Sequence, residues 1–139
     1  MKVWLMKAAD IKLGDWVYVV EDPKLDYYGS SDQFKVVQIN NVQVLDVDDV
    51  HFTGQHRNWC GNRFHSREFY FSDYNCEPHR NSAKANHQVF ATIEEAVEFV
   101  GTYVNQYPYM ILRVVTKQPE DEWYITYKDG TVRRARRQE

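Results

Sequence analysis

The pattern of apolar positions in the first half of the chain predicts several short β-strands. Residues 16–20 are apolar at every position and follow a Gly-Asp pair, which is typical of a strand packed on both faces. Residues 34–39 and 42–45 are further β-type runs, and the two asparagines between them predict a turn. Residues 21–33 are polar and contain proline, glycine and serines, so we expect a loop there.

A helix at about 93–105 is the clearest element of the second half. Thr92 and Glu95 have the spacing of a capping box, and apolar residues then repeat at helical intervals on one face. Gly101 weakens the helix, and its lack of a side chain suggests close packing on a sheet. A short strand at 89–90 leads into this helix.

The rest of the second half predicts a β-meander. Residues 110–115 have the composition of a buried strand, and an Asp-Gly pair between the β-type runs 123–127 and 131–133 predicts a hairpin. Residues 88–134 therefore predict the order β-α-β-β-β.

Residues 51–87 lie between these halves and show little regular pattern apart from a β-type run at 68–71. The stretch contains all five histidines, both cysteines and a dense set of aromatic residues. Its flanks are regular, so we interpret it as an insertion held by the surrounding structure. Residues 75–87 are expected to form a loop that joins a β-rich part, 1–74, to the part at 88–134.

Residues 11–50 resemble the opening of small SH3-like β-barrels, including those of the KOW type. The likeness is carried by Leu13, Gly14, Asp15, Trp16, Val17, Tyr18 and Val19, and then by Phe34, Lys35, Val36, Val37, Gln38 and Ile39. It implies a fold type only, because such barrels bind proteins, nucleic acids and peptides alike.

We therefore predict an α+β fold in a single domain, 1–139. Its N-terminal half is an SH3-like, partly open β-barrel of short strands, and its C-terminal half packs one amphipathic helix on an antiparallel meander. No apolar run approaches the roughly 18 residues of a membrane span. Without such a run or a signal-like N-terminus, we expect a cytoplasmic protein with its cysteines reduced.

The charge of the chain is acidic outside its last residues. The formal net charge is −3, and residues 133–139 hold four arginines and one glutamate, so the rest of the chain carries −6. Such a body disfavours duplex DNA, whose affinity for proteins comes from neutralised phosphates. It suits docking on a basic partner.

The histidines and cysteines suggest a metal site. His56 with Cys60, and Cys76 with His79, form two closely spaced pairs of the kind that a tetrahedral zinc site uses, with His65 between them. The alternative is two unrelated thiols and exposed histidines, since neither spacing matches a common zinc finger. Zinc is the only cofactor that the sequence suggests.

Enzymatic activity is not predicted. No catalytic signature surrounds either cysteine, no phosphate-binding glycine loop or serine nucleophile motif is present, and the three aspartates at 46–49 lack the spacing of an EF-hand. Three carboxylates at the end of a strand are also typical of a solvated turn.

Nucleotide or single-stranded nucleic-acid binding is an alternative. Arg57, Arg63, Arg67 and Arg80 alternate with aromatic residues, a combination that can stack bases and contact phosphates. These arginines can equally pair with Glu68, Asp73 and Glu77.

Protein binding is the function that the sequence favours. Aromatic residues with arginine are common at the centres of interfaces, and the chain is similar in style to small accessory or inhibitory proteins of phages and mobile elements. The predicted mechanism is occlusion of a partner enzyme's basic site, and the oligomeric state is left open. The expected binding surface comprises Trp59, Arg63, Phe64, Arg67, Tyr70, Tyr74, Asp46, Asp48 and Asp49.

Overall fold

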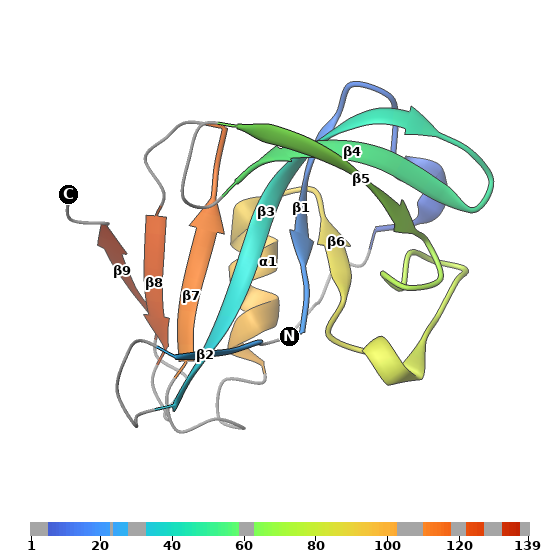
Figure 1. Cartoon of the computed structure of the whole chain (residues 1–139). Helices are drawn as coiled ribbons and strands as arrows, with labels where there is room; N and C mark the ends of the chain where they lie inside the picture. Colours follow the sequence, from blue (N-terminus) through green and yellow to red (C-terminus); the bar gives the residue numbers. More distant parts are fainter. Residues whose placement is uncertain are drawn as a thin grey trace.

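The computed structural model describes residues 6–22, 24–27, 33–58, 63–102, 110–117, 122–126 and 132–136. Within these ranges nine strands form one sheet, accompanied by one α-helix and two short 3-10 turns at Ala8–Asp10 and Ser82–Lys84 (Figure 1). The elements are β1 (Trp16–Val20), β2 (Lys24–Tyr27), β3 (Gln33–Val47), β4 (His51–Arg57), β5 (Phe64–Tyr70), β6 (Gln88–Phe90), α1 (Ile93–Gly101), β7 (Met110–Val115), β8 (Glu122–Thr126) and β9 (Val132–Arg136).

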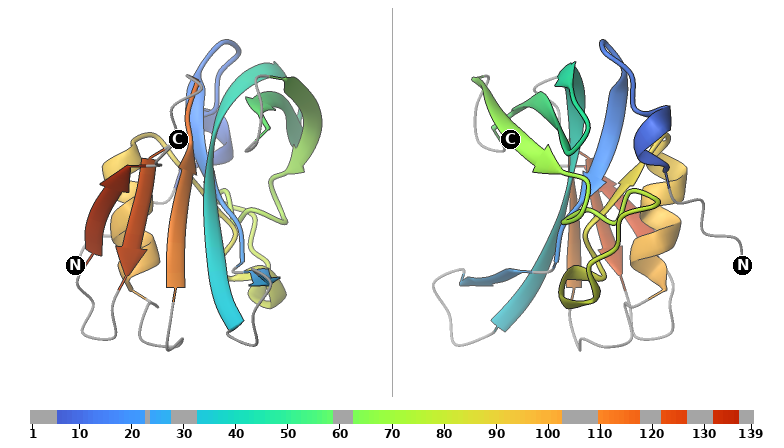
Figure 2. Two further views of the ribbon diagram at one scale, coloured as in Figure 1. Left: turned by 60° about the vertical axis from the view of Figure 1, so that its left-hand side comes forward. Right: turned by 90° about the vertical axis from the view of Figure 1, so that its right-hand side faces the viewer.

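The sheet is organised around β3, a strand of 15 residues. β3 pairs antiparallel with β1, β2 and β4 and parallel with β7, so the main path runs β5-β4-β3-β7-β8-β9, and β1 pairs with both β3 and β6. A register shift between Val44 and Asp46 accompanies a bend, and β4 and β5 fold over the face of the sheet opposite to α1 (Figure 2). The sheet does not close into a barrel. The fold is α+β, as predicted, and its sheet is mostly antiparallel, while an SH3-like relationship stays a prediction.

The turn predicted between residues 39 and 42 is wrong. Asn40 and Asn41 continue β3, pair with Val19 and Tyr18 of β1, and are both buried. Their polar groups are satisfied inside the sheet, because the Asn41 amide donates to the Val17 carbonyl oxygen (3.1 Å) and Oδ1 of Asn40 accepts from Gln38. Asparagine favours turns only where its side chain lacks such partners.

Two further strands lie where the sequence predicts irregular chain. β4 and the first part of β5 form a hairpin within the 51–87 stretch, and β2 lies inside the predicted 21–33 loop. The inward-facing positions of β4 are occupied by Phe52, Gly54 and His56, so this face carries only one large apolar side chain; the other buried residue of the strand is Arg57. A strand of that composition has too little hydrophobic alternation to be recognised.

The core has two parts, one on each face of the sheet. Between the sheet and the β4–β5 hairpin, Val17, Val19 and Val42 pack with Phe52, Phe69 and Phe71. On the opposite face, Ala96 and Val100 of α1 pack with residues of four strands: Val20, Val37, Ile39, Phe90, Leu112 and Val114. The sheet is therefore buried on both faces at β1 and β3, as the apolar run of 16–20 predicts.

α1 begins where the capping box predicts and ends at Gly101; residue 104 of the predicted helix lies outside the described ranges. A Cβ atom added at Gly101 would meet no atom of the described residues within 4 Å apart from its chain neighbours and the helix backbone, so this glycine does not mark close packing against them. The β-α-β-β-β order is confirmed by β6, α1 and β7 to β9, and β8 pairs antiparallel with β9. The Asp-Gly turn itself falls outside the described residues.

Replacing Thr92 by alanine is expected to lower the free energy of unfolding by about 1 kcal/mol. Oγ1 of Thr92 accepts a hydrogen bond from the Glu95 amide (3.2 Å), which otherwise has no partner within the first turn of α1. Urea unfolding measures the loss. Thr92→Ser keeps the hydroxyl and should keep most of the stability; an equal loss in both variants would contradict a capping role.

The described residues include no helix that is both long enough and apolar enough to cross a membrane.

Candidate functional site

Asp48 and Asp49 lie in the turn between β3 and β4, whereas Asp46 is the penultimate residue of β3; all three aspartates are exposed. Asp48 organises this turn: its Oδ1 accepts from the backbone amides of Val50 (2.8 Å) and His51 (2.9 Å), and its Oδ2 lies 3.0 Å from Nδ1 of His51. The two amide hydrogen bonds are the main reason that the pKa of Asp48 is lowered. Asp48 therefore remains a carboxylate at neutral pH.

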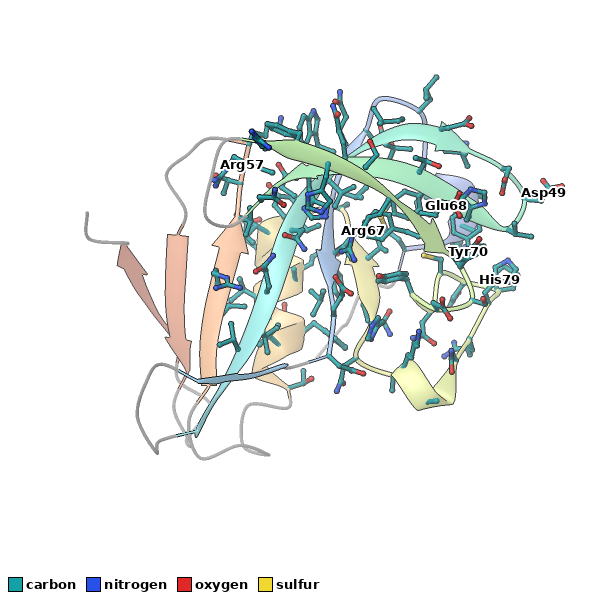
Figure 3. The ribbon with its side chains drawn as sticks, in the orientation of Figure 1. Asp49, Arg57, Arg67, Glu68, Tyr70 and His79 are labelled. Carbon is teal, nitrogen blue, oxygen red and sulfur yellow. The ribbon has the colours of Figure 1, made fainter. Side chains whose placement is uncertain are left out.

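The end of β5 brings Glu68 and Tyr70 beside this turn. Tyr70 pairs with His51 across the strands, with ring centroids 5.2 Å apart, and its hydroxyl donates to Oε2 of Glu68 (2.9 Å). Figure 3 shows Glu68 and Tyr70 at the same end of the hairpin as Asp49, far from Arg57. This end of the hairpin thus combines carboxylates with an exposed aromatic ring.

Strand register places a further pair of carboxylates in one row. Asp46 is opposite Thr53, and Thr53 is opposite Glu68, so the three side chains point to the same face of the sheet. Val50 in the turn and Tyr70 are 55% and 43% exposed. We call this set the acidic turn surface, and it comprises Asp46, Asp48, Asp49, Val50, Glu68 and Tyr70.

The other predicted binding residues do not join this surface. Arg63 and Phe64 are exposed at the opposite end of β5, and Trp59 lies outside the described residues. Tyr74 is only 7% exposed, so including it in an exposed surface is a mistake. Its hydroxyl donates to Oε2 of Glu21 (3.3 Å), and burial raises its pKa.

Arg67 points to the inner side of the hairpin, where it joins a partly buried polar cluster. Its Nη2 donates to Oε1 of Glu21 (2.6 Å), its Nε donates to Nε2 of His56 (3.1 Å), and its guanidinium lies over the Phe69 ring. Figure 3 shows the side chain beneath β5, facing the sheet. Arg67 therefore connects β5 to β4 and to the segment that follows β1.

His56 is the buried member of this cluster. Nδ1 lies 3.2 Å from the Arg57 carbonyl oxygen, so it carries the proton and Nε2 accepts from Arg67. Burial is the largest cause that lowers the pKa of His56 to about 4, and the positive charge of Arg67 acts in the same direction. The ring is neutral at pH 7 and its lone pair is occupied, so His56 is unsuited to act as a general base.

His87 completes the cluster on the side of Tyr74. Its ring centroid lies 5.3 Å from that of Tyr74, and its nitrogens lie 3.4 Å from a carboxylate oxygen of Asp22 and 3.9 Å from one of Glu21. The cluster thus connects five places in the chain: the segment after β1, β4, β5, the segment after β5 and the residue before β6. Glu21, in a predicted loop, carried no sequence signal for this role because its partners are distant in the chain.

The predicted metal ligands do not meet among the described residues. Cys60 is outside these residues, His79 stacks on Phe71, and Cys76 is buried, which raises the pKa of its thiol to about 12. No group of three or more His, Cys, Asp or Glu side chains that could hold a metal ion occurs in the described part of the chain.

The central arginines are mostly engaged within the protein. Nε of the buried Arg57 donates to the Thr116 carbonyl oxygen (3.0 Å), Arg67 pairs with Glu21, and Arg80 pairs with Glu77 at 3.2 Å. Of the central arginines, Arg57 and Arg67 are therefore directed into the protein, while Arg63 and Arg80 are exposed.

Comparison of the chain with protein-family models, with curated proteins and with solved structures found no match.

Proposed function

We propose that this chain is a non-enzymatic protein-binding module whose acidic turn surface docks on a basic surface of a partner protein. The observation that supports it is the convergence of four carboxylates with exposed Val50 and Tyr70 at one end of the β4–β5 hairpin. Gathered like charges repel one another in the free protein, and a basic partner relieves that repulsion.

Each part of this surface has a distinct role in binding. The carboxylates accelerate encounter with a basic surface and set the orientation of the partner. Val50 and Tyr70 contribute apolar contact area, and tyrosine is among the residues enriched at interface hot spots. Asp48 is held in place before binding by the amides of the turn, so little side-chain entropy is lost there.

The biological mechanism included in this proposal is occlusion of a partner enzyme's basic site in the cytoplasm, as small phage-type inhibitory proteins do. An SH3-like relationship of residues 11–50 would agree with a binding role. Nucleotide or nucleic-acid binding is less well supported, because Arg57, Arg67 and Arg80 already have partners in the protein.

Reversing two charges of the acidic turn surface tests the proposal. Asp46→Lys with Asp49→Lys leaves the hydrogen bonds of Asp48 intact and is expected to weaken binding at least about tenfold. The measurement is capture from host lysate with the wild-type chain, followed by titration of the recovered protein with each variant. Binding should also weaken as ionic strength rises.

The matched control is Glu94→Lys with Glu98→Lys, which makes the same change of charge on exposed positions of α1. It is expected to keep wild-type affinity. Equal weakening by both variants would show that only net charge matters, and unchanged affinity of the Asp46/Asp49 variant would exclude the acidic turn surface as the binding site.

A further inference from the structure

β5 is the last strand at one end of the sheet, and one of its edges has no partner strand among the residues that the structure describes. The right-hand view in Figure 2 shows it as the outermost strand of the curled part of the sheet. An edge strand presents backbone donors and acceptors that can pair with another chain. Proteins often protect such edges with proline, lysine, a bulge or an inward-pointing charge. β5 has no proline or lysine and a regular register with β4, and its inward-pointing Arg67 is already paired with Glu21.

The hydrogen bonds at both ends of the hairpin determine which backbone groups face the open edge. The Phe71 amide donates to the Val50 carbonyl oxygen (2.9 Å) and the Asn58 amide donates to that of Arg63 (2.8 Å). In an antiparallel pair, hydrogen-bonded positions alternate, so odd-numbered residues of β5 bond to β4. The amides of Phe64, Ser66, Glu68 and Tyr70 consequently point to the open edge. The Tyr70 carbonyl oxygen already accepts from the amides of Asp73 (3.0 Å) and Tyr74 (3.2 Å), so backbone pairing along this edge is centred on Ser66 and Glu68.

The same four residues have their side chains on the outer face, and β5 is complementary to itself along that face. Its ends carry two exposed aromatic rings, Phe64 and Tyr70, each 43% exposed. Arg63 stands before one end, while Glu68 and the acidic turn surface lie at the other. A strand with a basic beginning and an acidic end is matched by its own antiparallel copy.

We propose that two copies of this chain associate through the open edges of β5, in antiparallel pairing about a two-fold axis at Arg67. In this register Phe64 is opposite Tyr70 of the second copy, and Ser66 is opposite its Glu68. The rings form cross-strand aromatic pairs, and the Ser66 hydroxyl can donate to the opposing carboxylate. A two-fold axis makes every such contact twice.

The register also brings the two copies of Arg67 opposite each other on the inner face. Each guanidinium is already paired with Glu21 of its own chain at 2.6 Å, which offsets the repulsion between them. The acidic turn surfaces of both copies lie on the same face of the continuous sheet. The dimer contact uses Glu68 and Tyr70, which also belong to the acidic turn surface, but its test needs no basic protein partner.

The test is the mass of the full chain in solution, measured by analytical ultracentrifugation from low micromolar to several hundred micromolar protein. The expected result is a concentration-dependent dimer of the 16.6 kDa chain. Ser66→Pro removes an outward amide in both copies and places a ring at the edge, so it should raise the dissociation constant at least about 30-fold. Ser66→Ala keeps the amide and should still dimerise.

A chain that stays monomeric across this range would overturn the proposal, as would a folded Ser66→Pro variant that dimerises like the wild type. Circular dichroism shows whether that variant is folded. If it is not, amide hydrogen exchange of the wild type decides: the Ser66 and Glu68 amides should become protected as concentration rises. Exchange at these amides that is independent of concentration also rejects the β5 edge.

Discussion

Replacing Gly54 by alanine is expected to lower the free energy of unfolding by about 3 kcal/mol, because the new methyl group has no space. Its Cβ would overlap Cγ1 of Val42 and lie 3.2 Å from the Gln43 carbonyl oxygen and 3.4 Å from the Phe69 ring. Val42 is fully buried and branched at Cβ, so it has few alternative positions. The strain falls where β4 pairs with β3, within the hairpin that carries part of the acidic turn surface.

Urea unfolding of three variants separates strain from other effects. Combining Gly54→Ala with Val42→Ala removes the overlapping atom, so the double variant should be at least about 1 kcal/mol more stable than the sum of the single losses predicts. Gly101→Ala is the matched control, since a Cβ there has no close contact with the described part of the chain and alanine favours a helix. It should leave stability unchanged or raise it. A wild-type unfolding midpoint for Gly54→Ala would contradict the packing described.

Lowering the pH from 6.5 to 4 is expected to remove roughly 2–3 kcal/mol of stability through His56. The pKa of this histidine is about 4 in the folded chain, whereas an unfolded histidine titrates near 6.5. As the pH falls, the unfolded chain therefore binds the proton first. The stability that neutral His56 contributes is complete above pH 6.5 and is lost as the pH falls to about 4.

His56→Gln isolates this contribution. Glutamine can accept from Nε of Arg67 and donate to the Arg57 carbonyl oxygen, but it does not titrate. Urea unfolding at several pH values between 7 and 4 should show a shallower loss of stability in His56→Gln than in the wild type. His79→Gln, which removes a histidine outside the polar cluster, controls for the loss of a ring. Identical slopes for wild type and His56→Gln would contradict the buried neutral state.

The two expected effects have a common structural basis. Gly54 and His56 both face inward from β4, where the hairpin covers the sheet. Neither has a hydrophobic side chain, so neither contributes to an apolar pattern in the sequence. Their importance follows from what surrounds them: Val42 and Phe69 around the glycine, and Arg67 beside the histidine.

The elements that the sequence predicts well depend on interactions within a few residues. The capping box at Thr92 starts α1, the strands predicted on either side of the Asp-Gly pair are found as the antiparallel pair β8 and β9, and the apolar run 16–20 is a strand buried on both faces. Such signals need no information about distant residues, because the partners of each hydrogen bond or turn are neighbours in the chain. The sequence also indicates a solvated turn at the three aspartates, which the structure shows for Asp48 and Asp49, whereas Asp46 continues β3.

The rest depended on long-range pairing. Asn40 and Asn41 remain in a strand because both pair with β1. The Val17 carbonyl oxygen of β1, 24 residues away, accepts from the side-chain amide of Asn41, which would otherwise favour a turn. Asp46 and Glu68 share a surface only because Thr53 of β4 is the cross-strand neighbour of both. Arg67, predicted to be exposed for binding, turns inward because Glu21 and His56 stabilise its charge and its hydrogen bonds there. Local sequence determined which segments form strands and a helix, and tertiary pairing decided which side chains meet, since a hydrogen bond or ion pair between distant segments leaves no periodic signal.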